Sequence, residues 1–227
     1  MSGPARFLRD NGLSLVFGAG FLLSLVGQAV AGCAELNTVL TSASLAPVGC
    51  ADYVLTSDYL VDVTENWQSE FLQFFLFVSA TVWLVQRGSP ESKPLDRIGR
   101  ESDEEQKTGA YARPDSPVSA SAGGLRQGLY SNSLGIVMGL VFVLSWLAQS
   151  VTGRVTFNED QLREYQEPVD WVTYVTSAEF WNRTLQNWQS ELLAVASMVV
   201  LSVYLRQRGS PESKPVGAAH TSTGVEG

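Results

Sequence analysis

Residues 66–94 read NWQSEFLQFFLFVSATVWLVQRGSPESKP, and residues 187–215 read NWQSELLAVASMVVLSVYLRQRGSPESKP. Eighteen of these 29 paired positions are identical, including the whole of NWQSE and the whole of QRGSPESKP. The same shift of 121 residues pairs residues 11–32 with 132–153, where ten of 22 positions are identical. A match that keeps one offset without a gap predicts two copies of one structural unit.

The apolar residues of this 227-residue chain gather in four uncharged segments. The segments at 11–34 and 127–153 are each longer than the roughly 20 residues that cross a bilayer as a helix. The segments at 71–86 and 192–205 are shorter and reach that length only with their polar flanks. We therefore predict membrane spans at about residues 12–32, 66–87, 132–153 and 187–207.

Each copy would hold two spans joined by a loop, which returns the chain to the side from which it started. The copies then share one orientation and are related by a pseudo-twofold axis along the membrane normal. The prediction is an all-α fold: a four-helix transmembrane bundle made of two parallel two-helix repeats, in residues 1–94 and 128–215. Thr176 and Glu179 have capping-box spacing, which predicts that the last helix begins ahead of its span.

The segments outside the two copies differ in composition from the spans. Residues 95–127 combine charged residues with Pro, Ser and Gly and have few apolar side chains. Such a composition buries too little apolar surface to form a core. We therefore predict a disordered cytoplasmic linker at 95–127 and a disordered tail at 216–227.

The basic residues predict the orientation of the spans. Residues 33–65 contain no Lys or Arg and residues 154–186 contain three, so 12 of the 15 basic residues lie beside the termini and the linker. Cytoplasmic loops carry the excess of Lys and Arg in membrane proteins. Both termini and the linker are therefore predicted to be cytoplasmic, and the two loops within the copies to face outward.

Cys33 has two interpretations. Residues 29–33 resemble a signal-peptide cleavage site, which would remove the first span. The repeat partner of that span, at 132–153, lies inside the chain and cannot be a signal, which argues against cleavage. The alternative is a disulfide between Cys33 and Cys50 in the same outer loop, which an oxidising compartment permits.

Each NWQSE segment places polar side chains near the outer edge of its predicted span. Asn66 and Glu70 are four residues apart and so share one face of the helix. Gln28 lies one helical turn from the outer end of the first span, at a matching depth, and Trp67 has the ring that anchors a helix at the interface. The second copy repeats this arrangement with Gln149, Asn187 and Glu191, and with Trp188 as the anchor.

These polar residues support two hypotheses. In the first, they form polar clasps that hold the outer ends of the helices together through hydrogen bonds. In the second, Glu70 and Glu191 bind or relay a cation or a proton, since ionisable residues inside membranes are often functional.

The second repeated motif, QRGSPESKP, follows the end of a predicted helix. Arg87 and Arg208 suit the inner leaflet, and Gly88 and Gly209 suit a helix C-terminal cap. Neither role requires SPESKP to be identical in both copies. The identity predicts a docking contact with another part of the chain, with a second copy in a homodimer, or with a membrane partner.

The chain contains no Walker loop and none of the HExxH, GxSxG or CxxC motifs. We therefore expect no enzyme activity, metal site or cofactor, and no nucleic-acid partner. The lipid bilayer is the partner that the spans imply.

The tandem NWQSE and QRGSPESKP motifs resemble a family of small bacterial integral-membrane proteins classed as a domain of unknown function. The resemblance implies a multi-pass protein of the bacterial plasma membrane and brings no activity, substrate or cofactor. We expect a structural or accessory membrane protein. The alternative is a small proton- or cation-conducting protein that uses Glu70 and Glu191.

Overall fold

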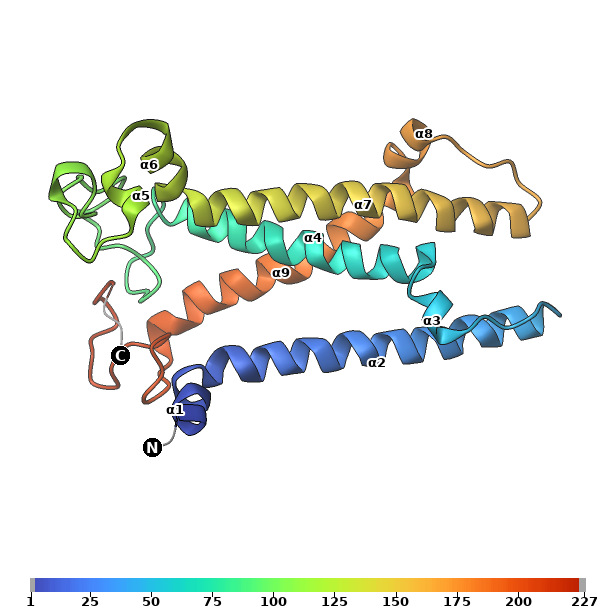
Figure 1. Cartoon of the computed structure of the whole chain (residues 1–227), viewed down its shortest axis with the longest axis horizontal. Coiled ribbons are helices and arrows are strands. Elements are labelled where there is room, and N and C mark those ends of the chain that lie inside the picture. The colour runs from blue at the N-terminus through green and yellow to red at the C-terminus, as the bar shows by residue number, and fades with distance from the viewer. Residues whose placement is uncertain (1–2, 225–227) are drawn as a thin grey trace. The chain divides into compact units, whose positions relative to one another are not determined.

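The computed structural model describes residues 3–224 (Figure 1). Over this range the chain forms helices and turns with no strand, which confirms the all-α prediction for the described residues. The elements are α1 (Gly3–Asp10), α2 (Gly12–Ser42), α3 (Cys50–Tyr53), α4 (Ser57–Ala80), η1 (Gly109–Tyr111), α5 (Val118–Ser121), α6 (Gly124–Ser131), α7 (Ser133–Arg163), α8 (Trp171–Val175) and α9 (Ala178–Tyr204).

The helix bounds keep the 121-residue offset of the sequence. Helices α1 and α2 have the same lengths as α6 and α7, and each bound lies 121 residues earlier. The break between the helices of each pair falls at Asn11 and Asn132. Each asparagine donates its side-chain amide to a carbonyl four residues earlier, Phe7 at 2.9 Å and Gly128 at 2.7 Å. An asparagine side chain that bonds to a nearby carbonyl competes with the backbone hydrogen bonds of a helix. The break between the helices is therefore a local effect of the asparagine.

Two of the described helices, α2 and α7, are long and apolar enough to cross a membrane by length and composition. Each has 31 residues and continues ten residues beyond the outer end of the span predicted for it. Helices α4 and α9 do not pass the same test, because NWQSE and the turns before it are polar.

Helices α4 and α9 begin nine residues before the predicted spans, and their starts and ends differ from expectation. The N-cap of α9 is Ser177, whose side chain accepts from the Phe180 amide, and not the predicted pair of Thr176 and Glu179. Helix α4 ends at Ala80, seven residues before the predicted span end, because the Ala80 carbonyl accepts from two amides of the following turn.

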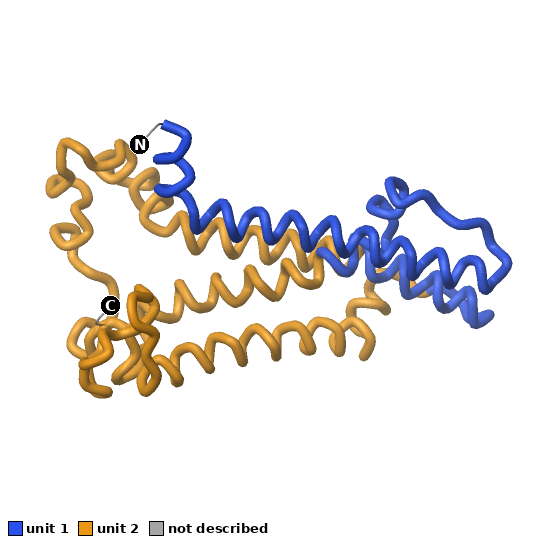
Figure 2. The backbone as a smooth tube through the Cα atoms, turned by 90° about the horizontal axis from the view of Figure 1, so that it is seen from below, with its two compact units in different colours: residues 1–63, 152–168 blue, residues 64–151, 169–227 orange. Residues whose placement is uncertain are grey.

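The chain divides into two compact units (Figure 2). The first contains the residues up to Val63 together with Thr152–Pro168, and the second contains Thr64–Val151 together with the residues from Val169 onward. Helices α4 and α7 each contribute residues to both units. The units therefore do not coincide with the two sequence copies.

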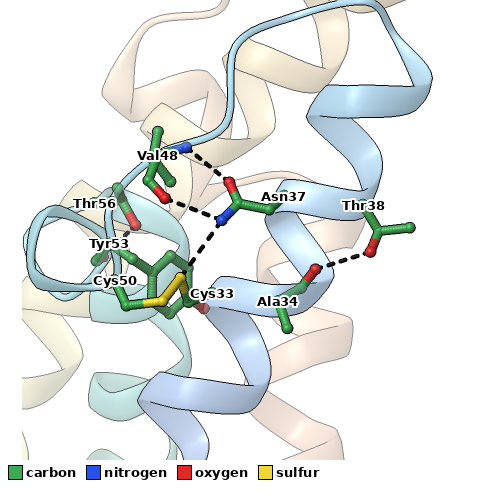
Figure 3. Close-up of a disulfide and its surroundings, with 8 residues drawn as sticks. All are labelled: Cys33, Ala34, Asn37, Thr38, Val48, Cys50, Tyr53 and Thr56. Carbon is green, nitrogen blue, oxygen red and sulfur yellow. Dashed lines mark hydrogen bonds between the residues drawn. A yellow bond between two sulfur atoms is a disulfide. The ribbon is translucent and has the colours of Figure 1, made fainter.

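The first unit is built around a disulfide between Cys33 of α2 and Cys50 of α3 (Figure 3). Asn37 bonds both the amide and the carbonyl of Val48, at 2.7 and 2.9 Å, which fastens the loop to α2. Tyr53 is buried beside the disulfide and covers Gly32 so closely that no larger residue fits there. The loop between α2 and α3 is thus tied to α2 by covalent and polar contacts.

Residues 95–127, predicted to be disordered, hold η1 and α5 and the start of α6 in the structure. The Gly99 amide donates to the Val82 carbonyl, and Lys93 pairs with the Glu101 carboxylate. These contacts join the beginning of the linker to the chain that follows α4.

Candidate functional site

Helices α4, α7 and α9 pack against one another in the second unit. The ring of Trp146 on α7 lies 6.0 Å from that of Trp181 and 6.4 Å from that of Trp188, both on α9. Two turns earlier on the same face of α7, a Cβ on Gly139 would meet the ring of Phe75 of α4 at 3.1 Å. Large aromatic surfaces at one level of α7 and a glycine at another allow the three helices to approach closely.

Each of these three helices carries a fully buried polar side chain. Gln68 on α4, Gln149 on α7 and Thr184 on α9 are each at most 1% exposed, and we call them the polar layer. The Trp188 indole donates to Gln68 Oε1 at 2.7 Å. The other amide atom of Gln68, the Gln149 Oε1 and the Thr184 hydroxyl have no hydrogen-bond partner among the described residues. Groups of this kind can hold an internal water or a small polar ligand.

A charged pair joins α4 to α9 beside the polar layer. Arg183 Nε lies 2.8 Å from Glu65 Oε2, and the side chains are 29% and 16% exposed. Tyr174 of α8 is buried nearby, and burial is the main cause that raises the pKa of its hydroxyl. The pair is specific to this arrangement, because Gln186 and Asp62 stand at the equivalent positions of the other copy.

The structure does not gather the predicted site residues into one buried cluster. Gln149 is buried, whereas Asn66 and Glu70 are exposed on α4. Asn187 and Glu191 are half-buried on α9, and the Asn187 amide donates to the Arg183 carbonyl at 3.0 Å. Gln28 is half-buried within the first unit. Among the predicted residues, Gln149 is the one that belongs to the polar layer.

The two tryptophans predicted as anchors differ in their environment. Trp67 is 39% exposed, whereas Trp188 is half-buried among aromatic rings and bonded to Gln68. The Trp188 contact joins one NWQSE segment to the other, because Gln68 belongs to the first copy and Trp188 to the second. The two NWQSE segments thus contact each other through different residues, the glutamine of the first and the tryptophan of the second.

Sequence reasoning missed Gln68, Thr184 and Trp146. Gln68 is identical in both copies but lies on another helix face than Asn66 and Glu70. Thr184 and Trp146 stand where the first copy has Val63 and Leu25. Positions where one copy is polar or aromatic and the other is aliphatic would have drawn attention to them, whereas a search for identical positions discards them.

The two QRGSPESKP segments, named here the first motif (86–94) and the second motif (207–215), fold into the same turn. The Gln86 amide donates to Ser92 Oγ at 2.9 Å, and the Gln207 amide donates to Ser213 Oγ at the same distance. The lysine of each motif donates to a carbonyl six residues later. Identical letters therefore specify identical local hydrogen bonds.

Gly88 and Gly209 shape this turn and do not cap the helices as predicted. Helices α4 and α9 end earlier, at Ala80 and Tyr204. The two glycines have φ of +86° and +83°, a conformation that glycine adopts without strain. The turn, and not a helix end, is what requires glycine here.

The two motifs face each other within the second unit. Pro90 and Glu91 of the first motif and Pro211 and Glu212 of the second line one pocket of about 100 Å³. Lys214 is 1% exposed and donates to the Gly88 carbonyl of the first motif. Burial, together with the nearby Arg206, lowers the pKa of the Lys214 ammonium group. The predicted docking of SPESKP thus occurs in part within the chain.

Lys214 also donates to the carbonyls of Ala219, His220 and Ser222. It therefore holds the C-terminal segment against the first motif. Between residues 3 and 224 no group of three or more His, Cys, Asp or Glu side chains converges to hold a metal ion.

A family profile described as "Domain of unknown function (DUF6766)" matches residues 4–225 of the chain. No curated protein and no solved structure matches the chain.

Proposed function

Since the chain belongs to the DUF6766 family, whose function is unknown, we propose a role from its own structure: a multi-pass membrane protein that is structural or accessory and has no catalytic activity. Helices α2, α4, α7 and α9 would cross a bacterial plasma membrane as two parallel repeats, with both termini and the linker in the cytoplasm. The shared helix bounds at an offset of 121 residues and the distribution of Lys and Arg support this topology.

The polar content of α4 and α9 is compatible with crossing. Their 24 and 27 residues correspond to about 36 and 40 Å of helix, more than the roughly 30 Å of a bilayer core. Gln68 and Thr184 are buried against other helices and need not meet lipid. Polar side chains inside membranes commonly face the bundle interior in this way.

The observation that carries the structural role is the hydrogen bond from Trp188 to Gln68, which joins the NWQSE segments of the two copies. The ion pair of Arg183 with Glu65 joins the same two helices. Interhelical polar contacts in membranes contribute about 0.6–2 kcal/mol each. Together they form the polar clasp of the proposal, with Gln68 in place of Asn66 and Glu70.

Conduction through Glu70 and Glu191 has less support. Glu70 is exposed on α4, and Glu191 is half-buried on α9. Flux measurements in liposomes would compare the wild type with Glu70→Gln plus Glu191→Gln. We expect neither protein to conduct protons or monovalent cations. Flux through the wild type that the double variant loses would replace the structural role by conduction.

Labelling of single cysteines in intact cells with a membrane-impermeant maleimide tests the topology. The paired Cys33 and Cys50 do not react, so the wild type serves as the blank. With four spans, Ser44→Cys and Gln166→Cys label and Ser102→Cys does not. If only α2 and α7 cross, Ser102→Cys labels and Gln166→Cys does not, and the four-span topology is wrong.

A further inference from the structure

The first and second motifs have the same internal hydrogen bonds but different surroundings. Gly88 and Ser89 of the first motif are buried, whereas Gly209 of the second is exposed. A Cβ on Gly88 would overlap the His220 carbonyl oxygen, while nothing lies within 4 Å of a Cβ on Gly209. What covers the first motif is the C-terminal segment of the chain itself, His220–Gly224.

The first motif binds this segment through backbone groups and a glycine. The Gly88 amide donates to Thr223 Oγ1 at 2.8 Å, and the Gly224 amide donates to the Ser89 carbonyl at 3.1 Å. A Cβ on Gly224 would lie 2.9 Å from the Ser92 carbonyl oxygen and 3.1 Å from the Pro94 ring. The first motif therefore selects a hydroxyl residue followed by glycine.

The second motif presents the same groups around an open pocket. Gly209, Ser210, Ser213 and Pro215 correspond one for one to Gly88, Ser89, Ser92 and Pro94, and all four line a pocket of about 350 Å³. Because the turn is the same in both motifs, the Gly209 amide and the Ser210 carbonyl have the same positions in their turn as the Gly88 amide and the Ser89 carbonyl.

The segment of this chain that stands in the equivalent sequence position cannot take the place of Thr223 and Gly224. A shift of 121 residues leads to Ser102 and Asp103. Ser102 has a hydroxyl, but Asp103 has a charged side chain where the first motif leaves no room for a Cβ. The linker holds one further Thr-Gly pair, Thr108–Gly109, but the Thr108 hydroxyl already donates to Asp103 within the linker. The occupant proposed here therefore comes from another chain. The tail of a second copy of this protein is already engaged at its own first motif.

We propose that the pocket of the second motif binds a short Thr-Gly segment of a partner protein, in the way that the first motif binds Thr223 and Gly224. The threonine hydroxyl accepts from the Gly209 amide, and the glycine amide donates to the Ser210 carbonyl. The inference gives the accessory role a partner of defined chemistry. It stands on the geometry of the pocket alone, so its failure would leave the proposed topology untouched.

The affinity should be low, because Lys93 is engaged with Gly99 and Glu101 and does not support the second pocket as Lys214 supports the first. Two hydrogen bonds and a small contact area correspond to a Kd on the order of 0.1 mM. Affinity of this order suits a contact that acts beside a larger interface or between proteins held in one membrane.

Fluorescence anisotropy with the full-length protein in detergent tests the proposal. The probe is a labelled peptide with the sequence of residues 218–224, AAHTSTG, amidated at its C-terminus. We expect saturable binding of one peptide per chain. A peptide with valine at the Thr223 position, or alanine at the Gly224 position, should bind about tenfold more weakly. Valine lacks the hydroxyl that accepts the hydrogen bond, and the alanine Cβ would crowd the site as it would at Gly224 of the first motif.

The protein variants separate the two motifs. Gly209→Ala places a Cβ where the peptide would lie and should abolish binding. Gly123→Ala, at a glycine outside the pocket that also has a positive φ and open space around a Cβ, should not. Binding that survives Gly209→Ala would mean that the peptide exchanges with the tail at the first motif, and it would overturn the proposal. Absence of saturable binding up to about 1 mM peptide would also overturn it. The peptide variants keep the test valid if Gly209→Ala is unstable.

Discussion

The same five letters, NWQSE, have opposite environments in the two copies. Gln68 is fully buried and accepts a hydrogen bond from Trp188, while its counterpart Gln189 is exposed. Contact between α4 and α9 does not bury Gln189, because on α9 it is Trp188 that donates to Gln68. A repeat therefore determines local conformation, and burial depends on residues that are not repeated.

The two QRGSPESKP motifs also have the same local structure and different surroundings. Both copies close the same turn, but only the first is covered by the C-terminal segment. Residues 220–224 cover Gly88 of the first motif, while Gly209 of the second motif is exposed. Two identical motifs with the same internal hydrogen bonds therefore have unequal surroundings.

The largest expected difference between the copies concerns the loops that follow α2 and α7. Cys33 and Cys50 are joined in the first loop, whereas Arg154 and Trp171 stand at these positions in the second. Replacing both cysteines by serine should lower the free energy of unfolding by about 3 kcal/mol, because the unfolded chain regains the freedom of a closed loop. Denaturant unfolding in detergent measures this loss.

Hydrogen exchange on the same two proteins shows where the effect falls. Exchange should rise in residues 43–49 and stay unchanged in residues 164–170. An equal rise in both loops would show that the disulfide acts on the whole molecule and not on its own copy.

The second largest difference separates the two motif lysines. Lys214→Met should cost about 2 kcal/mol, because it leaves the buried carbonyls that Lys214 bonds without a donor. Lys93→Met, the matched control, should cost about 1 kcal/mol or less, because Lys93 is partly exposed and pairs with one carboxylate. Thermal unfolding of both variants checks the order. Equal losses would contradict the unequal roles of the two motifs.

A third comparison uses the glutamines of the pentapeptide. Gln68→Ala should lower stability by about 1–2 kcal/mol, because the Trp188 indole loses its acceptor inside the helix packing. Gln189→Ala should change stability by about 0.5 kcal/mol at most, as is usual for an exposed side chain. The difference in the free energies of unfolding is the measurement, and a loss at Gln189 as large as that at Gln68 would refute the asymmetric clasp.

The smallest expected effect is a pH dependence of the free energy of unfolding that arises in the second copy, at Glu159. Partial burial, with a contribution from Asp58, raises the pKa of Glu159 above its ordinary value of 4.5, and Arg163 opposes the shift. A raised folded-state pKa stabilises the protein at pH below 4.5, and this contribution is lost as the pH rises through the folded-state value. Glu159 is largely exposed, so the loss should be only a few tenths of a kcal/mol.

Glu159→Thr, which restores the residue of the first copy at Thr38, should remove this dependence. Melting temperatures at pH 4 and pH 7 provide the measurement. A variant with the same pH profile as the wild type would assign the dependence to another group.

Much of the fold is readable from local patterns, and much of the candidate site is not. The apolar segments locate the long helices, and Gln149 lies buried on α7 as its helical position suggests. The end of α4 at Ala80 is not readable, because it depends on turn hydrogen bonds after an apolar helix. Gln68 could not be chosen over Asn66, because all five NWQSE residues are identical between the copies.

The sequence by itself determined where the four long helices lie, the 121-residue correspondence of α1 and α2 with α6 and α7, and the shared turn of the two QRGSPESKP motifs. These features follow from side chains within a few residues of each other along the chain. The tertiary structure alone decided that Gln68 is buried and Gln189 exposed, that the C-terminal segment covers the first motif, and that Trp188 donates to Gln68. Those outcomes depend on contacts between residues more than a hundred positions apart, which no local pattern encodes.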